Sequence, residues 1–119
     1  MPRVKRGLTV HQRHKKVLAL TKGHRATKHA LYRRAHESMI KSLSYAYSHR
    51  RERKGDMRRL WISRVNAASR AQGLTYGQFI DGLKKSGVEI NRKLLADMAV
   101  REPESFAHLV TLAKGKVQG

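Results

Sequence analysis

The feature that most constrains this chain is a change of composition within residues 50–71, RRERKGDMRRLWISRVNAASRA. The first half of this stretch is a run of cations with almost no apolar residues. The second half has apolar residues at spacings of 1, 4 and 3: Leu60, Trp61, Val65 and Ala68. These spacings are typical of a helix with one buried face. The first half needs an anionic partner and the second needs a hydrophobic core, which predicts a basic arm joined here to a small domain.

The charge of the chain is divided in the same way. Residues 1–60 hold 18 of the 27 Lys and Arg residues against three acidic residues, a balance of +15. Residues 61–119 hold nine against five, a balance of +4. An excess as large as that of the first half destabilises a compact body by self-repulsion, and nucleic acid is the usual polyanion that neutralises it. We therefore expect a basic arm at 1–56 and a compact domain at 57–119.

Composition also excludes several classes of protein. The chain has no Cys, which rules out disulfides and thiolate metal sites. It has no run of about 18 apolar residues that could cross a bilayer, and no signal-peptide core follows the N-terminal charges. A cytosolic protein is the simplest expectation.

Two helices are predicted in the arm. The first has Thr9 as its N-cap and ends before Gly23. The second covers 25–49, where apolar residues follow steps of three and four: Leu31, Ala35, Met39, Ile40, Leu43, Ala46 and Tyr47. At 1.5 Å per residue this helix is too long for the width of a small domain, so it must lie against another molecule or project. Gly55 is expected to kink the chain.

The compact domain should contain four short helices. The first runs from Met57 to Gln72 and ends at Gly73. The second begins with a capping box formed by Thr75 and Gln78. The third is capped by Asn91, and the fourth starts at Pro103 and ends at Gly115. The sequence has no strand-period segment and no internal repeat, so the predicted fold class is all-α: a long basic N-terminal helical arm followed by a small four-helix C-terminal domain.

No catalytic constellation is evident. The eight acidic residues are scattered, and the closest spacing, Glu102 with Glu104, flanks Pro103 at a helix start, where it suits the helix dipole. His11 and His14 are three apart, so a metal pair is geometrically feasible, but the surrounding cations repel a dication and no carboxylate completes the set. We expect neither an enzyme nor a bound metal or other cofactor.

The first 60 residues contain six clusters of Lys and Arg. A solvent-exposed surface without a binding role does not explain so many. Arg suits bidentate phosphate contacts and stacking on bases. In the compact domain, Lys84 and Lys85 end one predicted helix, and Arg92 and Lys93 begin the next. We expect the loop between them to bring both pairs of cations onto one edge as a shaped recognition surface. The alternative is that Lys84 and Lys85 merely complement a helix C-terminus. The candidate RNA-binding residues are Arg3, Lys5, Arg6, Arg13, His14, Lys15, Lys16, Lys22, Arg25, Arg33, Arg34, Arg50, Arg51, Arg53, Lys54, Arg58, Arg59, Arg64, Lys84, Lys85, Arg92 and Lys93. Trp61 is expected in the core rather than as a stacking platform, because it shares a helix face with Val65 and Ala68.

An arm joined to a domain favours structured RNA as the partner. A basic segment with a thin apolar stripe is poorly folded alone and orders between packed RNA helices. A sequence-reading DNA protein would usually show a dimer seam or a recognition helix, and neither is evident. Two alternatives remain, a nonspecific DNA-compacting protein and a membrane-active cationic helix. Against the latter, the 25–49 helix carries four serines: Ser38, Ser42, Ser44 and Ser48.

Specific sequence segments resemble a known family. RVKRG, RHKK, RRLWI and RVNAA, together with FIDGLKK and RKLLADMAV, occur in order along nearly the whole chain. Through these segments the chain resembles the bacterial large-subunit ribosomal protein L20 family. It departs from the sequence pattern of that family at His24 and Gly55.

The resemblance implies a function. Members of this family bind large-subunit ribosomal RNA early and are needed for subunit assembly. The arm would penetrate the RNA, and the domain would lie on an RNA helix junction beside neighbouring ribosomal proteins. Members can also bind their own messenger RNA through the domain and repress its translation, which would map onto Lys84, Lys85, Arg92 and Lys93.

Overall fold

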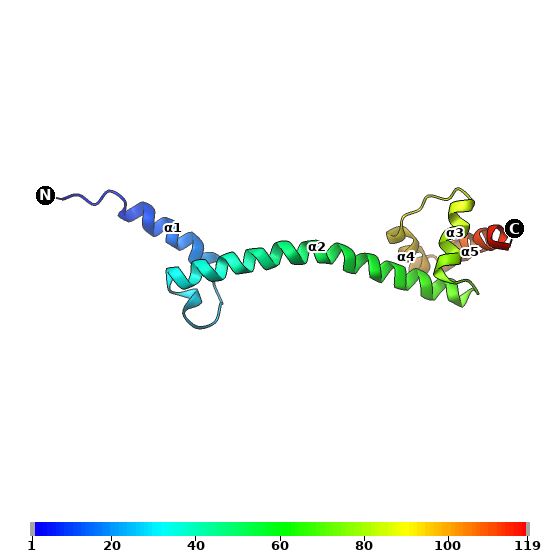
Figure 1. Cartoon of the computed structure of the whole chain (residues 1–119), viewed down its shortest axis with the longest axis horizontal. Coiled ribbons are helices and arrows are strands. Elements are labelled where there is room, and N and C mark those ends of the chain that lie inside the picture. Colours follow the sequence, from blue (N-terminus) through cyan, green and yellow to red (C-terminus); the bar gives the residue numbers. More distant parts are fainter. Residues whose placement is uncertain (1, 119) are drawn as a thin grey trace. The chain divides into compact units, whose positions relative to one another are not determined.

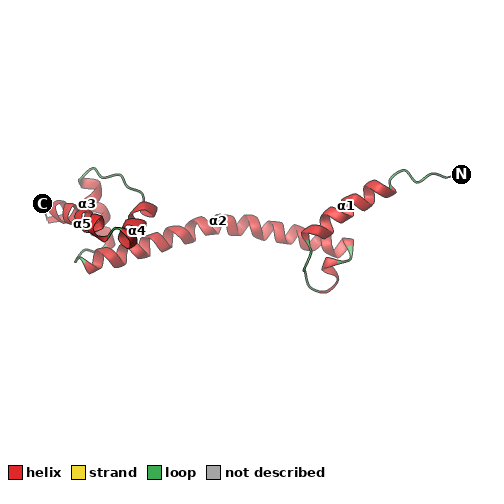
Figure 2. Ribbon diagram, turned by 180° about the vertical axis from the view of Figure 1, so that it is seen from behind, coloured by secondary structure: helices red, strands yellow, loops and turns green. Residues whose placement is uncertain are grey.

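A computed structural model describes residues 2–118, and all of the regular structure in this range is helical (Figures 1 and 2). This confirms the all-α fold class. In chain order the elements are α1 (Gly7–Leu20), the 3₁₀ turn η1 (Ala26–His29), α2 (Tyr32–Ala71), α3 (Tyr76–Lys85), α4 (Arg92–Arg101) and α5 (Pro103–Gln118).

The chain forms two compact units, Met1–Arg51 and Glu52–Gly119, and the division falls inside helix α2. Here the units are called the arm unit and the C-terminal unit. The boundary expected from composition, between residues 56 and 57, lies in the same helix and stays a prediction.

The arm unit has a very small core. Among its described residues, 2–51, the buried ones are Val17, Thr21 and Ala35. Two longer-range contacts join α1 and the segment after it to the start of α2: the ring of His14 stacks on Tyr32, with centroids 3.7 Å apart, and the His24 Nδ1 lies 2.6 Å from the Ser38 hydroxyl. So little buried apolar surface contributes only a few kcal/mol, which is modest for a unit of this length.

The expected N-cap of the first helix is wrong. Helix α1 starts at Gly7 after Arg6, which provides no side-chain cap, and the Thr9 hydroxyl instead donates back to the Arg6 carbonyl at 3.1 Å. The first turn is exposed to solvent, so water can satisfy its free N–H groups without a side chain.

The second helix, predicted over 25–49, has different bounds in the structure. Residues 26–29 form η1, and Ala26 has a positive φ of 56°, which a continuing α-helix does not allow. Helix α2 begins at Tyr32 and continues without interruption through Gly55 to Ala71, so the separate helix predicted from Met57 is the last part of α2. A single Gly costs a helix about 1 kcal/mol relative to Ala, too little to break it between flanking residues that favour helix.

The core of the C-terminal unit is formed by the end of α2 with α3, α4 and α5. Val65, Phe79, Leu95 and Val110 are almost fully buried, and the rings of Phe79 and Phe106 lie 5.1 Å apart. Helix α5 packs against both α3 and α4. These contacts bury one apolar stripe from each helix, as the sequence spacing indicates.

Predicted caps of the short helices are confirmed. The Thr75 hydroxyl accepts from the Gln78 N–H, and the Gln78 side chain accepts from the Thr75 N–H, which is a complete capping box. The Asn91 Oδ1 accepts from the Leu94 N–H at 2.9 Å, and Pro103 begins α5. Gly73 has φ +94°, the left-handed conformation expected after the end of a helix.

Three details of the predicted domain differ from the structure. Leu60 is 40% exposed and does not belong to the buried stripe in which it was expected, and Leu94, on the third predicted helix, is 53% exposed although its apolar side chain is typical of a core. Helix α5 continues through Gly115 to Gln118. Each position lies at the margin of an apolar stripe or near the end of a helix, where spacing along the sequence discriminates least.

Candidate nucleic-acid interface

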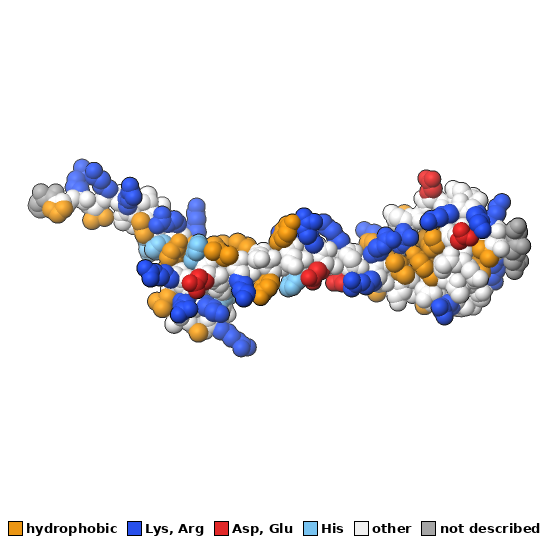
Figure 3. Space-filling model, in the orientation of Figure 1, with side chains coloured by type: hydrophobic (Ala, Val, Ile, Leu, Met, Phe, Trp, Pro, Cys, Tyr) orange, Lys and Arg blue, Asp and Glu red, His pale blue; other side chains and the backbone are white. Residues whose placement is uncertain are grey.

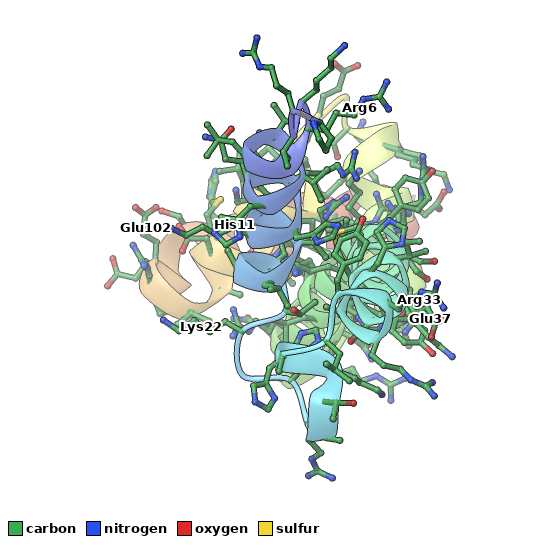
Figure 4. All side chains as sticks on the ribbon, turned by 90° about the vertical axis from the view of Figure 1, so that its left-hand side faces the viewer. Arg6, His11, Lys22, Arg33, Glu37 and Glu102 are labelled. Carbon is green, nitrogen blue, oxygen red and sulfur yellow. The ribbon has the colours of Figure 1, made fainter. Side chains whose placement is uncertain are left out.

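The cations of the arm unit are exposed on several sides. Every Lys and Arg residue expected to bind RNA in this unit is exposed to solvent. Figure 4 shows the labelled side chains of Arg6, Lys22 and Arg33 pointing in different directions from the residue before α1, the segment after α1 and the start of α2. A partner that meets these charges has to surround the unit rather than touch one face.

Within residues 2–118, four acidic residues form ion pairs with cations of their own helix. The ion pairs are Arg34–Glu37 (3.9 Å), Arg59–Asp56 (3.2 Å), Lys85–Asp81 (2.9 Å) and Arg101–Asp97 (3.1 Å), all three or four residues apart and all exposed. Exposed pairs of this kind contribute little to stability. They leave most of the positive charge of the chain available to a partner.

A shallow hollow lies on the arm unit. Three of the residues that line it are cations, Lys28, Arg34 and Lys41, and Ser38, Ser42, Glu37 and Tyr45 complete it. Lys28 and Lys41 are absent from the residues that the sequence singled out. Ammonium groups beside hydroxyls suit a phosphate oxygen.

Two hollows of the C-terminal unit are lined by residues from the two cation pairs, and Arg92 lines both hollows, whereas the shared recognition edge stays a prediction. Lys84 and Arg92 line one hollow with an apolar floor. Lys85 instead reaches Asp81 on its own helix, and Lys93 lines a different hollow beside α2. The loop between α3 and α4 thus brings together one residue from each pair.

A second hollow of the C-terminal unit is formed by α2 and the start of α4, and is called here the Trp61 hollow. Its lining residues are Lys54, Arg58, Trp61, Asn91, Arg92 and Lys93. It has four cations and no acidic residue around one aromatic ring. Figure 3 shows Lys and Arg side chains beside apolar surface on this unit.

Tyrosines contact three of the candidate residues, of which Arg51 lies over the Tyr47 ring, 4.7 Å from its centroid. Arg92 donates from Nε to the Tyr76 hydroxyl at 2.7 Å, and His14 stacks on Tyr32. These two are half-buried, whereas the other candidate residues are exposed. Side chains held in this way lose less freedom when they meet a ligand.

Trp61 lies at the boundary between the core, where the sequence placed it, and the surface. It packs against the core and also lines the Trp61 hollow and the neighbouring one that contains Arg64 and Asp97. A sequence signal existed: Lys54, Arg58 and Trp61 are four and three residues apart, and so share a helix face.

No group of three or more His, Cys, Asp or Glu side chains within residues 2–118 could hold a metal ion, and His14 is engaged with Tyr32. In the same range, no helix is both long and apolar enough to span a membrane.

The fold and the surface together define a class of protein: a basic helical protein with an exposed cationic arm and a small packed domain. Residues 3–109 match the family described as Ribosomal protein L20. The chain belongs to this family, as the sequence motifs indicated, and the family is one of ribosomal proteins rather than enzymes.

Similar proteins from several bacteria cover the chain almost completely. A protein of Dehalococcoides mccartyi named "Large ribosomal subunit protein bL20" is 63% identical over 113 residues, 95% of each chain. The proteins of the same name from Moorella thermoacetica and Natranaerobius thermophilus are 60% and 59% identical over 117 residues. These alignments cover 98% of this chain and 97% and 100% of the two relatives.

Proposed function

We propose that this chain is a structural protein of the large ribosomal subunit, which binds large-subunit ribosomal RNA directly and is needed early in subunit assembly. The relatives carry the name of the subunit. The observation that carries the direct RNA contact is the arm unit, where cations on several sides surround a core of three buried residues.

Structured RNA supplies both things that the arm unit lacks. Phosphates neutralise its cations, and each neutralised phosphate releases counterions, which drives binding. RNA also covers apolar surface: Ile40, Leu43 and Tyr47 are spaced along one face of α2 and are each more than half exposed. A flat membrane or a straight duplex would meet only one side of the unit.

The C-terminal unit supplies shape. Its core fixes the positions of Arg92 and Trp61, so the surface around them presents a defined pattern of charge to the RNA. We assign recognition to this unit and electrostatic clamping to the arm unit. Binding of the chain's own messenger RNA would use the same surface of the C-terminal unit.

A salt titration of the full chain tests this proposal. The ligands are a large-subunit ribosomal RNA transcript and duplex DNA with the same number of phosphates. We expect tighter binding to the RNA at every salt concentration, because shape and unpaired bases add to the charge term. Equal affinity for the two ligands would favour the alternative, a nonspecific DNA-compacting protein.

Assembly provides a second test. Charge reversal at Arg50, Arg51, Arg53 and Lys54 places four acidic side chains on α2 without touching the core. We expect large subunits to accumulate as incomplete particles in cells that contain only this variant. Normal assembly in such cells would contradict the proposal.

A further inference from the structure

The Trp61 hollow has a composition that one class of ligand fits. Nucleotides combine a flat aromatic base with an anionic phosphate, and proteins bind unpaired ones through an aromatic ring flanked by cations. In this hollow the ring is Trp61, and the cations are Lys54 and Arg58 on α2 and Arg92 and Lys93 on α4.

The indole of Trp61 is anchored but incompletely covered. It is half-buried and packs against the core of the C-terminal unit. Among residues 2–118 the indole Nε1 has no hydrogen-bond partner. Every buried side-chain nitrogen or oxygen in this range has a partner, so the Nε1 is not buried. The N–H group is therefore open to solvent, and a partner can still contact this part of the ring.

The cations around the ring are arranged for an anion. Arg92 is held through its Nε by the Tyr76 hydroxyl, which leaves the outer nitrogens of its guanidinium free to donate. Lys93 lines both hollows that adjoin the indole. Asp97, the acidic residue of the neighbouring hollow, pairs with Arg101, which lines neither.

We propose that Trp61 stacks on the base of an unpaired nucleotide of large-subunit ribosomal RNA, whose flanking phosphates bind Arg58 and Lys93. This inference rests on the proposed function and adds to it one nucleotide subsite. The nucleotide is unpaired because a base inside an A-form helix has both faces covered, whereas a bulge or loop leaves a face free. An acidic peptide would satisfy the cations but would leave the indole without a partner.

Fluorescence reports on this residue alone, because Trp61 is the only Trp in the chain. In the free full-length protein we expect iodide to quench the emission, since part of the ring is exposed and cations surround it. Addition of the ribosomal RNA transcript should quench the emission further by stacking and should protect the ring from iodide. Unchanged emission together with unchanged access to iodide in the saturated complex would overturn the inference, and this measurement needs no variant.

Substitutions test the contribution of the ring. Trp61→Phe keeps an aromatic face, and Trp61→Leu keeps apolar packing without one. We expect Trp61→Leu to weaken RNA binding by about fivefold or more, the range measured for loss of base stacking, and Trp61→Phe to retain most of the affinity. Thermal melting by circular dichroism checks that both variants are folded at the temperature of the assay. Equal affinities for Trp61→Leu and the wild type would overturn the inference.

A matched pair of charge variants tests the phosphate contacts. Lys93→Gln and Arg101→Gln each remove one positive charge from α4, but only Lys93 lines the Trp61 hollow. We expect Lys93→Gln to weaken binding more than Arg101→Gln does, and chemical probing to show one unpaired nucleotide with altered reactivity in both the Lys93→Gln and Trp61→Leu complexes. Equal effects of the two charge variants would contradict the assignment.

The outcomes separate the inference from the proposed function. If the wild-type chain does not prefer ribosomal RNA to duplex DNA, the proposed function fails. If the wild-type chain does prefer the RNA, but Trp61 substitutions leave the RNA affinity unchanged and RNA binding leaves the indole emission unchanged, only the subsite fails. If poly-glutamate protects the indole from iodide as well as the RNA does, the hollow belongs to an acidic protein partner instead.

Discussion

Arg92 and His14 are the two half-buried candidate side chains, and a tyrosine restrains each of them. Arg92 is bonded to Tyr76, and His14 is stacked on Tyr32. A freely rotating Arg or Lys gives up rotamer entropy when it is immobilised by a ligand. We therefore expect these two positions to contribute specificity, whereas the exposed cations contribute mainly affinity.

Gly82 is the residue on which the packing of α3 against α5 most directly depends. A Cβ at this position would lie 2.6 Å from the Ala113 carbonyl oxygen and 2.8 Å from the Ala113 Cα. Those atoms belong to the backbone of α5, which cannot move aside as a flexible side chain can. Only Gly allows the two helices to approach this closely.

Gly82→Ala should therefore destabilise the C-terminal unit. Ala favours a helix by about 1 kcal/mol over Gly, but displacing a backbone segment in a packed core costs about 1–3 kcal/mol. We expect a lower midpoint of thermal unfolding, measured by circular dichroism. Gly77→Ala on the same helix is the control, because a Cβ there meets nothing within 4 Å. Equal midpoints for the two variants would show that α3 and α5 separate easily.

At the scale of single elements, α2 combines two functions along one face. Lys54, Arg58, Trp61 and Val65 follow each other at spacings of four, three and four. Along this face the side chains change from exposed cations to a half-buried indole and then to a fully buried Val. The same helix thereby presents cations to solvent and closes the core.

Gly55→Ala tests whether α2 is a continuous helix. A Cβ at position 55 meets nothing within 4 Å, so Ala should stabilise the helix by up to about 1 kcal/mol. We expect more helix by circular dichroism at 222 nm and unchanged RNA affinity. Gly23→Ala, where φ is +88°, is the contrasting variant and should destabilise the arm unit. A loss of helix in Gly55→Ala would show that the chain bends there.

The capping box of α3 makes a prediction about a single element. Thr75→Ala removes the side-chain acceptor for the Gln78 N–H, and the loss of such a cap costs about 1 kcal/mol. We expect the midpoint of urea unfolding to fall with an unchanged slope. Thr111→Ala is the control, since that exposed hydroxyl donates only to the Ala107 carbonyl of its own helix. A larger effect at Thr111 would contradict the assigned role.

The contrast between these elements shows what sequence could predict. The caps at Thr75, Asn91 and Pro103 were predictable because each depends on residues within one turn of the helix. The start of α2 at Tyr32 was not, because it depends on contacts between residues 14 and 32 and between 24 and 38. Only part of the Trp61 hollow could be predicted from the sequence, because Lys93 lies on α4 and Trp61 lies on α2.

At the scale of the whole molecule, the division of charge predicts how the two units respond to salt. In the proposed function the arm unit contacts many phosphates, and each contact adds about 0.7–0.9 to the slope of log K against log salt. The C-terminal unit has less net charge and a defined surface. Its contribution to binding should therefore persist at higher salt.

The triple variant Arg13→Gln, Lys15→Gln and Lys16→Gln tests this expectation in the full chain. All three residues are exposed on α1, so folding should be unaffected, and the slope should fall by about 2–3. The control removes the same charge from the C-terminal unit at Arg70, Arg101 and Lys116, which line neither hollow of the Trp61 region. Equal slopes for the two triple variants would mean that only net charge matters.

By itself, the sequence determined the helical class, the asymmetry of charge, the caps and the family, because each depends on residue type, local spacing or ordered motifs. Tertiary structure alone decided that α2 begins at Tyr32 and that Lys84 and Arg92 line one hollow. It also placed the indole of Trp61 in contact with both core and surface. These features depend on which helix faces meet and how closely, and packing between segments distant in the sequence sets both.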